Sequence, residues 1–117
     1  MPAAKLNLQV EQNATYRKKF TLRSQKGRPV NLTGFAALMQ IRASYGVSEV
    51  LLELSTDNGR IKPLSNDGAI ELEIPSAQTA TLGQGVYDIV LVSPDNSVKR
   101  LVQGKVLISP GTSKAIG

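Results

Sequence analysis

Tight turns recur along the second half of the chain, and they constrain its fold more than any other feature. Asp57-Asn58-Gly59, Asn66-Asp67-Gly68 and Pro94-Asp95-Asn96 separate short runs rich in Val, Ile and Leu. Glycine permits a positive φ, proline presets φ, and Asp or Asn bonds to nearby backbone, so these triplets predict turns between strands. The pattern indicates a small antiparallel β-sandwich.

Alternation of apolar and polar residues locates the strands between these turns. In residues 35–43, for example, Ala37, Met39 and Ile41 share one face, opposite Leu38 and Arg42. Residues 76–82 predict one short helical turn with Ser76 as its N-cap. The predicted strands are 6–11, 15–23, 35–43, 50–54, 69–74, 86–92 and 98–108, with 60–62 as a short extra strand in a meander between 50–54 and 69–74.

The run Gly85-Val86-Tyr87-Asp88-Ile89 narrows the sandwich to an immunoglobulin-like one. In such folds a tyrosine near the start of the sixth strand bonds to backbone a few residues upstream, at a corner between the sheets. We therefore predict a structural role for Tyr87. The fold prediction is an all-β, immunoglobulin-like antiparallel β-sandwich of about seven or eight strands, forming one domain over residues 1–117 with short arms at 1–5 and 111–117.

Two positions break the regular alternation. Gly104 lies inside the last predicted strand, where glycine marks a bulge or a close backbone approach, and we expect a change of register there. Lys18 has the same parity as Tyr16 and Phe20. That placement predicts either a bulge or a lysine that extends along apolar surface to reach water.

The composition argues against an enzyme. The 117 residues include no cysteine and no histidine, so a disulfide, a thiolate metal site, a Cys–His pair and a Ser–His–Asp triad are all excluded. Glu71 and Glu73 lie two residues apart on the polar side of a predicted strand, which indicates a solvated face. We predict no catalytic residue, no cofactor and no metal site.

The net charge of +5 does not by itself indicate nucleic-acid binding. The basic residues are scattered and aromatic residues make up only 4% of the chain, whereas single-strand binders need stacking platforms. We place Arg17-Lys18-Lys19 and Lys99-Arg100 on edge strands, where basic residues oppose aggregation. The N-terminus has no apolar secretory core, and no run of 18 apolar residues occurs, so we predict no membrane partner.

Two surfaces are candidates for binding. Leu51, Val90 and Val92 fall opposite the core residues of their strands, and strands that are apolar on both faces are usually covered. These three residues, with Ile116 in the C-terminal arm, form the predicted subunit interface. Tyr45 is the one aromatic residue expected to be exposed, and it is the candidate contact for a glycan.

Several segments form one pattern along the chain. They are Phe20-Thr21-Leu22, Gly27-Arg28-Pro29-Val30-Asn31-Leu32-Thr33-Gly34, Ala37-Leu38-Met39-Gln40-Ile41-Arg42, Gly68-Ala69-Ile70-Glu71-Leu72, Gly85-Val86-Tyr87-Asp88-Ile89 and Leu101-Val102-Gln103-Gly104-Lys105-Val106. The most specific part is the loop from Gly27 to Gly34 followed by Met39-Gln40-Ile41-Arg42. Taken together, these segments resemble the small β-sandwich modules of tailed bacteriophages, such as the N-terminal domain of baseplate upper proteins. The resemblance extends over roughly Leu6 to Pro110.

The resemblance implies a non-enzymatic virion protein, assembled in the host cytoplasm, that links parts of the tail, baseplate or fibre attachment. Its implied partners are other virion proteins and further copies of the chain. It supplies no catalytic residues, and we expect Arg42 to bond a carboxylate such as Glu53 or Asp88. Two alternatives are a capsid decoration protein and a carbohydrate-binding module that touches the host surface through Tyr45.

Overall fold

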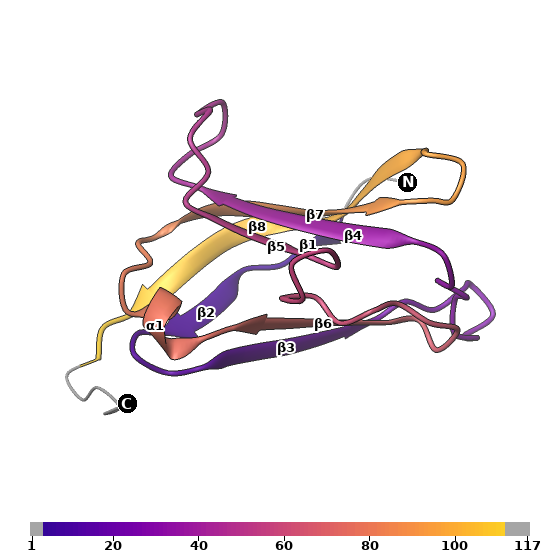
Figure 1. The fold of residues 1–117 in the computed structure, drawn as a ribbon, viewed down its shortest axis with the longest axis horizontal. Helices are drawn as coiled ribbons and strands as arrows, with labels where there is room; N and C mark the ends of the chain where they lie inside the picture. The colour runs from indigo at the N-terminus through magenta and orange to yellow at the C-terminus, as the bar shows by residue number, and fades with distance from the viewer. Residues whose placement is uncertain (1–3, 112–117) are drawn as a thin grey trace.

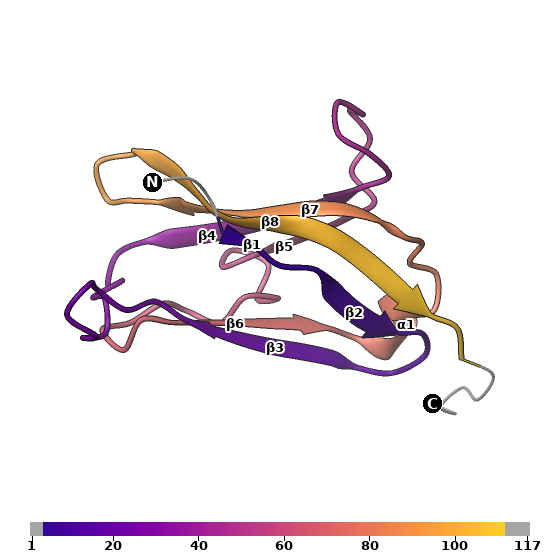
Figure 2. The same cartoon turned by 180° about the vertical axis from the view of Figure 1, so that it is seen from behind.

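Two β-sheets packed face to face make up the computed structural model, which describes residues 4–111 (Figures 1 and 2). The predicted all-β sandwich is confirmed. Its elements are β1 (Ala4–Lys5), β2 (Leu8–Glu11), β3 (Tyr16–Thr21), β4 (Ala36–Arg42), β5 (Leu52–Ser55), β6 (Ala69–Ile74), the single-turn helix α1 (Ser76–Thr79), β7 (Gly85–Val92) and β8 (Val98–Ser109).

The larger sheet, sheet A, has the strand order β1-β8-β7-β4-β5, and β2 also pairs with β8. The pairs β7–β8, β4–β7 and β4–β5 are antiparallel, but β1 and β2 run parallel to β8. Sheet A is therefore mixed, and the prediction of purely antiparallel strands is wrong for its first strands. A hairpin turn enforces antiparallel pairing between consecutive strands, whereas no turn joins the first strands to the last.

The smaller sheet, sheet B, consists of β3 and β6 in antiparallel pairing. Ile61 bridges Leu72 along the other edge of β6, where the Lys62 amide donates to the Glu71 carbonyl at 3.0 Å. The predicted meander is wrong, because β5 belongs to sheet A whereas residues 60–62 lie along the edge of β6 in sheet B. With β8, β7, β4 and β5 in one sheet and β3 and β6 in the other, the strands divide as in variable-type immunoglobulin domains.

The core lies between the sheets and contains the predicted alternating residues. Ala37, Met39 and Ile41 of β4 are buried, and so are Tyr87 and Ile89 of β7. They face the buried side chains of sheet B, chiefly Ile70, Leu72 and Ile74. Burial of these side chains is the main force that holds the two sheets together.

The predicted turns are present, with the backbone conformations that their residues favour. Gly59 and Gly68 have φ values of 78° and 72°, and Asn96 has 69°. In the turn before β6, the Asp67 carboxylate accepts the Ala69 amide at 3.0 Å and the Ser65 hydroxyl at 3.1 Å. These hydrogen bonds hold the pKa of Asp67 below its usual value.

The N-terminal strand is interrupted at Leu6 and Asn7, between β1 and β2. Contacts with Tyr87 and Gly104 fix the backbone at this interruption. The Tyr87 hydroxyl donates to the Leu6 carbonyl at 2.6 Å, and a Cβ at Gly104 would collide with that same oxygen. The backbone of Leu6 thus approaches Gly104 closely, which is one of the two roles predicted for this glycine. The change of register falls instead between Ile89 and Val90.

Tyr87 has the predicted structural role, but its predicted partner was wrong. Its hydrogen bond reaches across 81 residues of sequence to Leu6, rather than to the corner just before β7. Tyr87 pairs with Gly104 on the inner side of sheet A, and the missing side chain lets the N-terminal segment cross above the ring. Burial, with smaller contributions from Tyr16 and Tyr45, raises the pKa of Tyr87 to about 12.

Of the other local predictions, the one for Lys18 is confirmed and the one for Ser76 is wrong. Of the two alternatives predicted for Lys18, the bulge is absent, since β3 pairs with β6 in regular register. The lysine side chain instead extends to solvent, and its Nζ lies 5.8 Å from the centre of the Phe20 ring. Ser76 is not the N-cap of α1; Pro75 occupies that position and makes no side-chain cap. Thr79 is instead buried and donates from Oγ1 to the Ala14 carbonyl at 2.8 Å, which fixes α1 to the turn before β3.

Of the predicted arms, residues 1–5 and 111–117, only Ala4, Lys5 and Gly111 fall within the described residues. Ala4 and Lys5 pair with β8, and the Gly111 carbonyl accepts Asn13 Nδ2 at 3.2 Å, so both positions belong to the folded sandwich. The basic residues lie where only one neighbouring strand is described. Arg17–Lys19 lie on β3, which pairs with β6. Lys99 and Arg100 lie at the start of β8, where the described residues pair with β7 alone, since β1 joins β8 only at Val102 and Gln103.

Candidate functional site

The outer face of sheet A has an apolar half at the end that carries the β7–β8 hairpin (Figure 1). Strand pairing places Ala36, Val92 and Val98 in one row across β4, β7 and β8, and Leu38 and Val90 in the next. Val98 is 66% exposed, and the other four side chains are half-buried by their neighbours. We call these five residues the apolar half.

The next row of the same face is polar from one edge to the other. Register places Gln103, Asp88, Gln40 and Glu53 side by side on β8, β7, β4 and β5. Gln40 Nε2 donates to Glu53 Oε1 at 2.9 Å, and Arg100 Nε lies 3.3 Å from Asp88 Oδ2. This row divides the outer face into two chemically different parts.

Beyond the polar row, Arg42 holds the loop of residues 43–50, which we call the Tyr45 loop. Arg42 Nη1 donates to the carbonyls of Val47 and Ser48, both at 2.7 Å, and Nη2 donates to Gln40 Oε1 at 2.8 Å. The predicted bond to Glu53 or Asp88 is therefore wrong. The loop folds back over the strand end and brings its own carbonyl oxygens within reach of the guanidinium, while Arg100 occupies Asp88.

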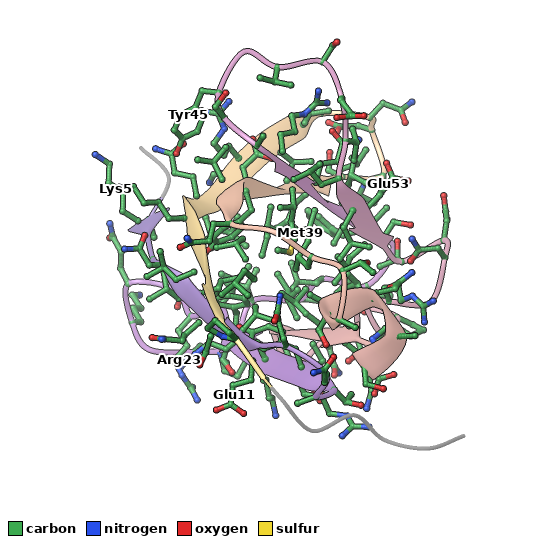
Figure 3. All side chains as sticks on the ribbon, turned by 90° about the vertical axis from the view of Figure 1, so that its left-hand side faces the viewer. Lys5, Glu11, Arg23, Met39, Tyr45 and Glu53 are labelled. Carbon is green, nitrogen blue, oxygen red and sulfur yellow. The ribbon has the colours of Figure 1, made fainter. Side chains whose placement is uncertain are left out.

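The Tyr45 loop stands above sheet A at the end opposite the hairpin (Figure 1). Tyr45 is 68% exposed, and it lines two hollows of the surface. Figure 3 shows Tyr45 and Lys5 on the same side of the molecule, away from Glu53. The smaller hollow, about 180 Å³, is lined by Gln40, Arg42, Ser44, Tyr45, Gly46, Val86, Tyr87 and Asp88, and the larger, about 420 Å³, by Lys5, Asn7, Tyr45, Asp88, Arg100, Gln103, Gly104 and Lys105.

The structure brings together some of the predicted interface residues and separates others. Val90 and Val92 lie together in the apolar half. Leu51 is 41% exposed, but it lies at the level of Arg42 rather than of Leu38. At ~3.3 Å per residue, these two positions of β4 are about 13 Å apart. Leu51 lines a separate hollow together with Leu82 and Gly83. Leu51 is thus not part of this patch, and Ile116 lies outside the described residues.

Sequence reasoning did not assign Leu38 and Val98 to this surface. The signal for Leu38 was present, since it alternates with the buried Ala37 and Met39. Val98 gave no comparable signal, because it begins a strand and its outward direction depends on the change of register after Ile89. Only pairing across β7 places it beside Val92.

The two other ion pairs within the described residues are ordinary surface pairs. Arg17 Nε lies 2.8 Å from Glu73 Oε1, and Lys62 Nζ lies 3.9 Å from Glu71 Oε1, both at well-exposed sites. Such pairs contribute about 0–1 kcal/mol each. Within residues 4–111, no cluster of three or more acidic side chains is arranged to hold a metal ion, and no helix has the length and apolar character needed to cross a bilayer.

Comparison of the sequence with known proteins adds no relative. No protein-family model matches the chain, and no curated protein matches it. The resemblance to bacteriophage modules therefore remains a prediction, and any function must be argued from the surfaces described above.

Proposed function

We propose that the protein is a non-enzymatic structural component of a tailed-bacteriophage virion, an adaptor in the tail, baseplate or fibre attachment. In this proposal it assembles with other virion proteins and with further copies of itself. The bacteriophage context comes from the segments quoted above. The assembly role is supported by one structural observation, the apolar half of sheet A.

The apolar half is suited to be the centre of an interface. Five apolar side chains from three strands are contiguous there, on the face that points away from the core. Specific interfaces have an apolar centre and a polar rim, and bury about 800 Å² per partner. Arg100 and Ser55, at the two ends of the second row, would lie in such a rim.

The shape of the face limits how a partner can approach. The Tyr45 loop rises at one end of sheet A, so a flat partner cannot lie along the whole length of the strands (Figure 1). A second copy that packs on the apolar half alone avoids the loop. It leaves the rest of the face, from the polar row to the Tyr45 loop, accessible. We therefore propose two copies in contact through their apolar halves as the basic unit of assembly.

Val90→Asp tests this unit, with Leu51→Asp as the matched control. A carboxylate at Val90 would be desolvated in the interface, whereas Leu51 is exposed outside the apolar half. We expect light scattering to give a dimer or larger assembly for the wild type and Leu51→Asp, and a monomer for Val90→Asp. Circular dichroism and thermal unfolding would establish that both variants remain folded.

A monomeric wild type would contradict the proposed unit, and so would a Val90→Asp variant that assembles as the wild type does. Repeating the measurement with candidate virion proteins tests the context separately. A folded chain that joins none of them would contradict the virion assignment, even if it forms a dimer by itself.

A further inference from the structure

The Tyr45 ring lines two hollows and is held there by a preorganised loop. Arg42 makes two charge-assisted hydrogen bonds of 2.7 Å to the loop carbonyls, so part of the entropic cost of ordering the loop is met before any ligand arrives. Most of the ring is open to solvent, which provides an accessible aromatic surface beside polar groups.

The larger hollow combines this ring with planar amides and charged side chains. Gln103 and Asn7 contribute amide groups, and Asn7 is fixed because its Oδ1 accepts the Lys105 amide at 3.0 Å. An amide side chain offers both donors and acceptors, as the vicinal hydroxyls of a sugar require. An aromatic face packs against the C–H face of a pyranose ring because the π surface is negative and the C–H groups are slightly positive.

The charge around the ring selects among saccharides. Lys5, Arg42, Arg100 and Lys105 line the two hollows, and Asp88 is the one carboxylate that lines them. Asp88 is already paired with Arg100, and Arg42 is occupied by the loop carbonyls and Gln40. Lys5 and Lys105 line the same hollow as the Tyr45 ring. A neutral sugar would have no group to pair with their positive charges, whereas an anionic sugar would.

From these observations we infer that the Tyr45 groove, formed by the two hollows and the ring that lines both, binds an anionic saccharide. The sugar ring packs on Tyr45, its hydroxyls bond to the amides, and its carboxylate or phosphate lies near Lys5 and Lys105. This inference does not depend on the proposed virion role. The groove lies along the polar row and the Tyr45 loop and borders the apolar half at Arg100, so Tyr45, Lys5 and Lys105 remain open when the apolar half is covered.

Calorimetric titration of the full chain with three probes tests the inference. The probes are an oligosaccharide of alternating glucuronate and N-acetylglucosamine, a poly(glycerol phosphate) oligomer without sugar rings, and a neutral glucose oligomer of matched length. We expect the first to bind most tightly, because it provides both a ring and a charge. Rising salt should weaken its binding, since the charge contribution is screened.

Variants at the loop tip then localise the site. Tyr45→Ala should weaken binding of the acidic oligosaccharide at least about tenfold, whereas Tyr45→Phe should retain it because the ring is kept. Lys105→Ala should weaken the acidic probe selectively. Val92→Asp, in the row of the apolar half that lies farther from Arg100, should leave binding unchanged, and thermal unfolding would confirm that each variant is folded.

Several results would overturn the inference. The inference is wrong if the wild type binds none of the three probes, or if Tyr45→Ala binds the acidic oligosaccharide as tightly as the wild type does. Equal affinity for the neutral oligomer would contradict an anionic ligand. Preference for poly(glycerol phosphate) over both sugars would contradict stacking of a sugar ring on Tyr45.

Discussion

Gly104 shows how a single residue can determine the path of a distant segment. Its missing Cβ leaves room for the Leu6 carbonyl, which would otherwise collide with the side chain. The same oxygen accepts the Tyr87 hydroxyl, so one point of contact joins β7, β8 and the break between β1 and β2. A glycine in a strand interior lowers strand propensity, and here this close approach compensates for it.

Replacement of Gly104 by alanine should therefore destabilise the sandwich by about 1–3 kcal/mol, the usual cost of overpacking. Gly83→Ala is the matched control, because an added Cβ there meets no atom within 4 Å and no positive φ is required. We expect the control to stay within about 0.5 kcal/mol of the wild type. Urea unfolding of both variants measures the difference, and equal free energies of unfolding would show that Leu6 does not approach Gly104 closely.

Tyr87 makes stability depend on pH in the alkaline range. Its pKa is raised by burial from 10.0 to about 12 in the folded protein. Its contribution is therefore complete below pH 10, falls as the unfolded chain ionises first, and is lost as pH rises through about 12. This difference between the folded and unfolded pKa values corresponds to at most about 2–3 kcal/mol of stability.

Comparison with Tyr87→Phe separates this effect from the titration of the lysines. At neutral pH the variant should be about 1–3 kcal/mol less stable, because the Leu6 carbonyl loses its partner. Between pH 10 and 12 the wild type should lose this advantage. A difference in unfolding free energy that stays constant across that range would contradict the assigned environment of Tyr87.

At the scale of elements, the Tyr45 loop is held by Arg42 as well as by its own turn, in which the Val47 amide donates to the Ser44 carbonyl at 3.4 Å. A guanidinium presents parallel donors in a fixed plane, and Arg42 uses them on two successive carbonyls and on Gln40. Lysine offers a single ammonium on a flexible stem. The arrangement of the loop thus depends on the end of β4 in addition to the turn at Ser44–Val47, where Gly46 has a φ of 83°.

We expect Arg42→Lys to loosen residues 43–50 while it changes the melting temperature little, because the loop is exposed and contributes little to the core. Amide hydrogen exchange should become faster at Val47 and its neighbours. The turn at residues 94–96 is held by its own hydrogen bonds and serves as an internal control. Unchanged exchange in the Tyr45 loop would mean that Arg42 does not hold it.

Alternation along single strands was predictable, but the assignment of strands to sheets was not. Ala37, Met39 and Ile41 had to share a face once β4 was a strand, and their burial followed. The course of residues 56–62, from β5 in sheet A to the edge of β6 in sheet B, depends on contacts between residues far apart in sequence. Local alternation contains no information about which strands become neighbours.

At the scale of the whole molecule, the first strands close the larger sheet beside the last one. β1 and β2 lie parallel to β8, and this pairing brings Lys5 next to Gln103 and Asn7 next to Lys105. The Tyr45 groove therefore combines three distant segments: the N-terminus, the loop after β4, and β8. From the sequence, only Tyr45 among these residues could be proposed as a contact.

The outer face of sheet A owes its two halves to the register of four strands. The apolar residues at Leu38, Val90 and Val98 are separated in sequence by tens of residues or by a turn, and only antiparallel pairing and the shift after Ile89 make them contiguous. The same pairing separates Leu51 from them. This register places an assembly surface and a ligand groove on one face, where the two meet at Arg100.

The sequence by itself determined the fold class, the turns, the faces of the strands and the buried role of Tyr87. Each of these follows from short-range chemistry: φ preferences of Gly, Asn and Pro, and the two-residue period of a strand. Tertiary structure alone decided the parallel first strands, the Leu6 partner of Tyr87, the position of Leu51 and the grouping around Tyr45. Those features depend on pairing between distant segments, which is selected by the free energy of the whole packed sandwich rather than by any local pattern.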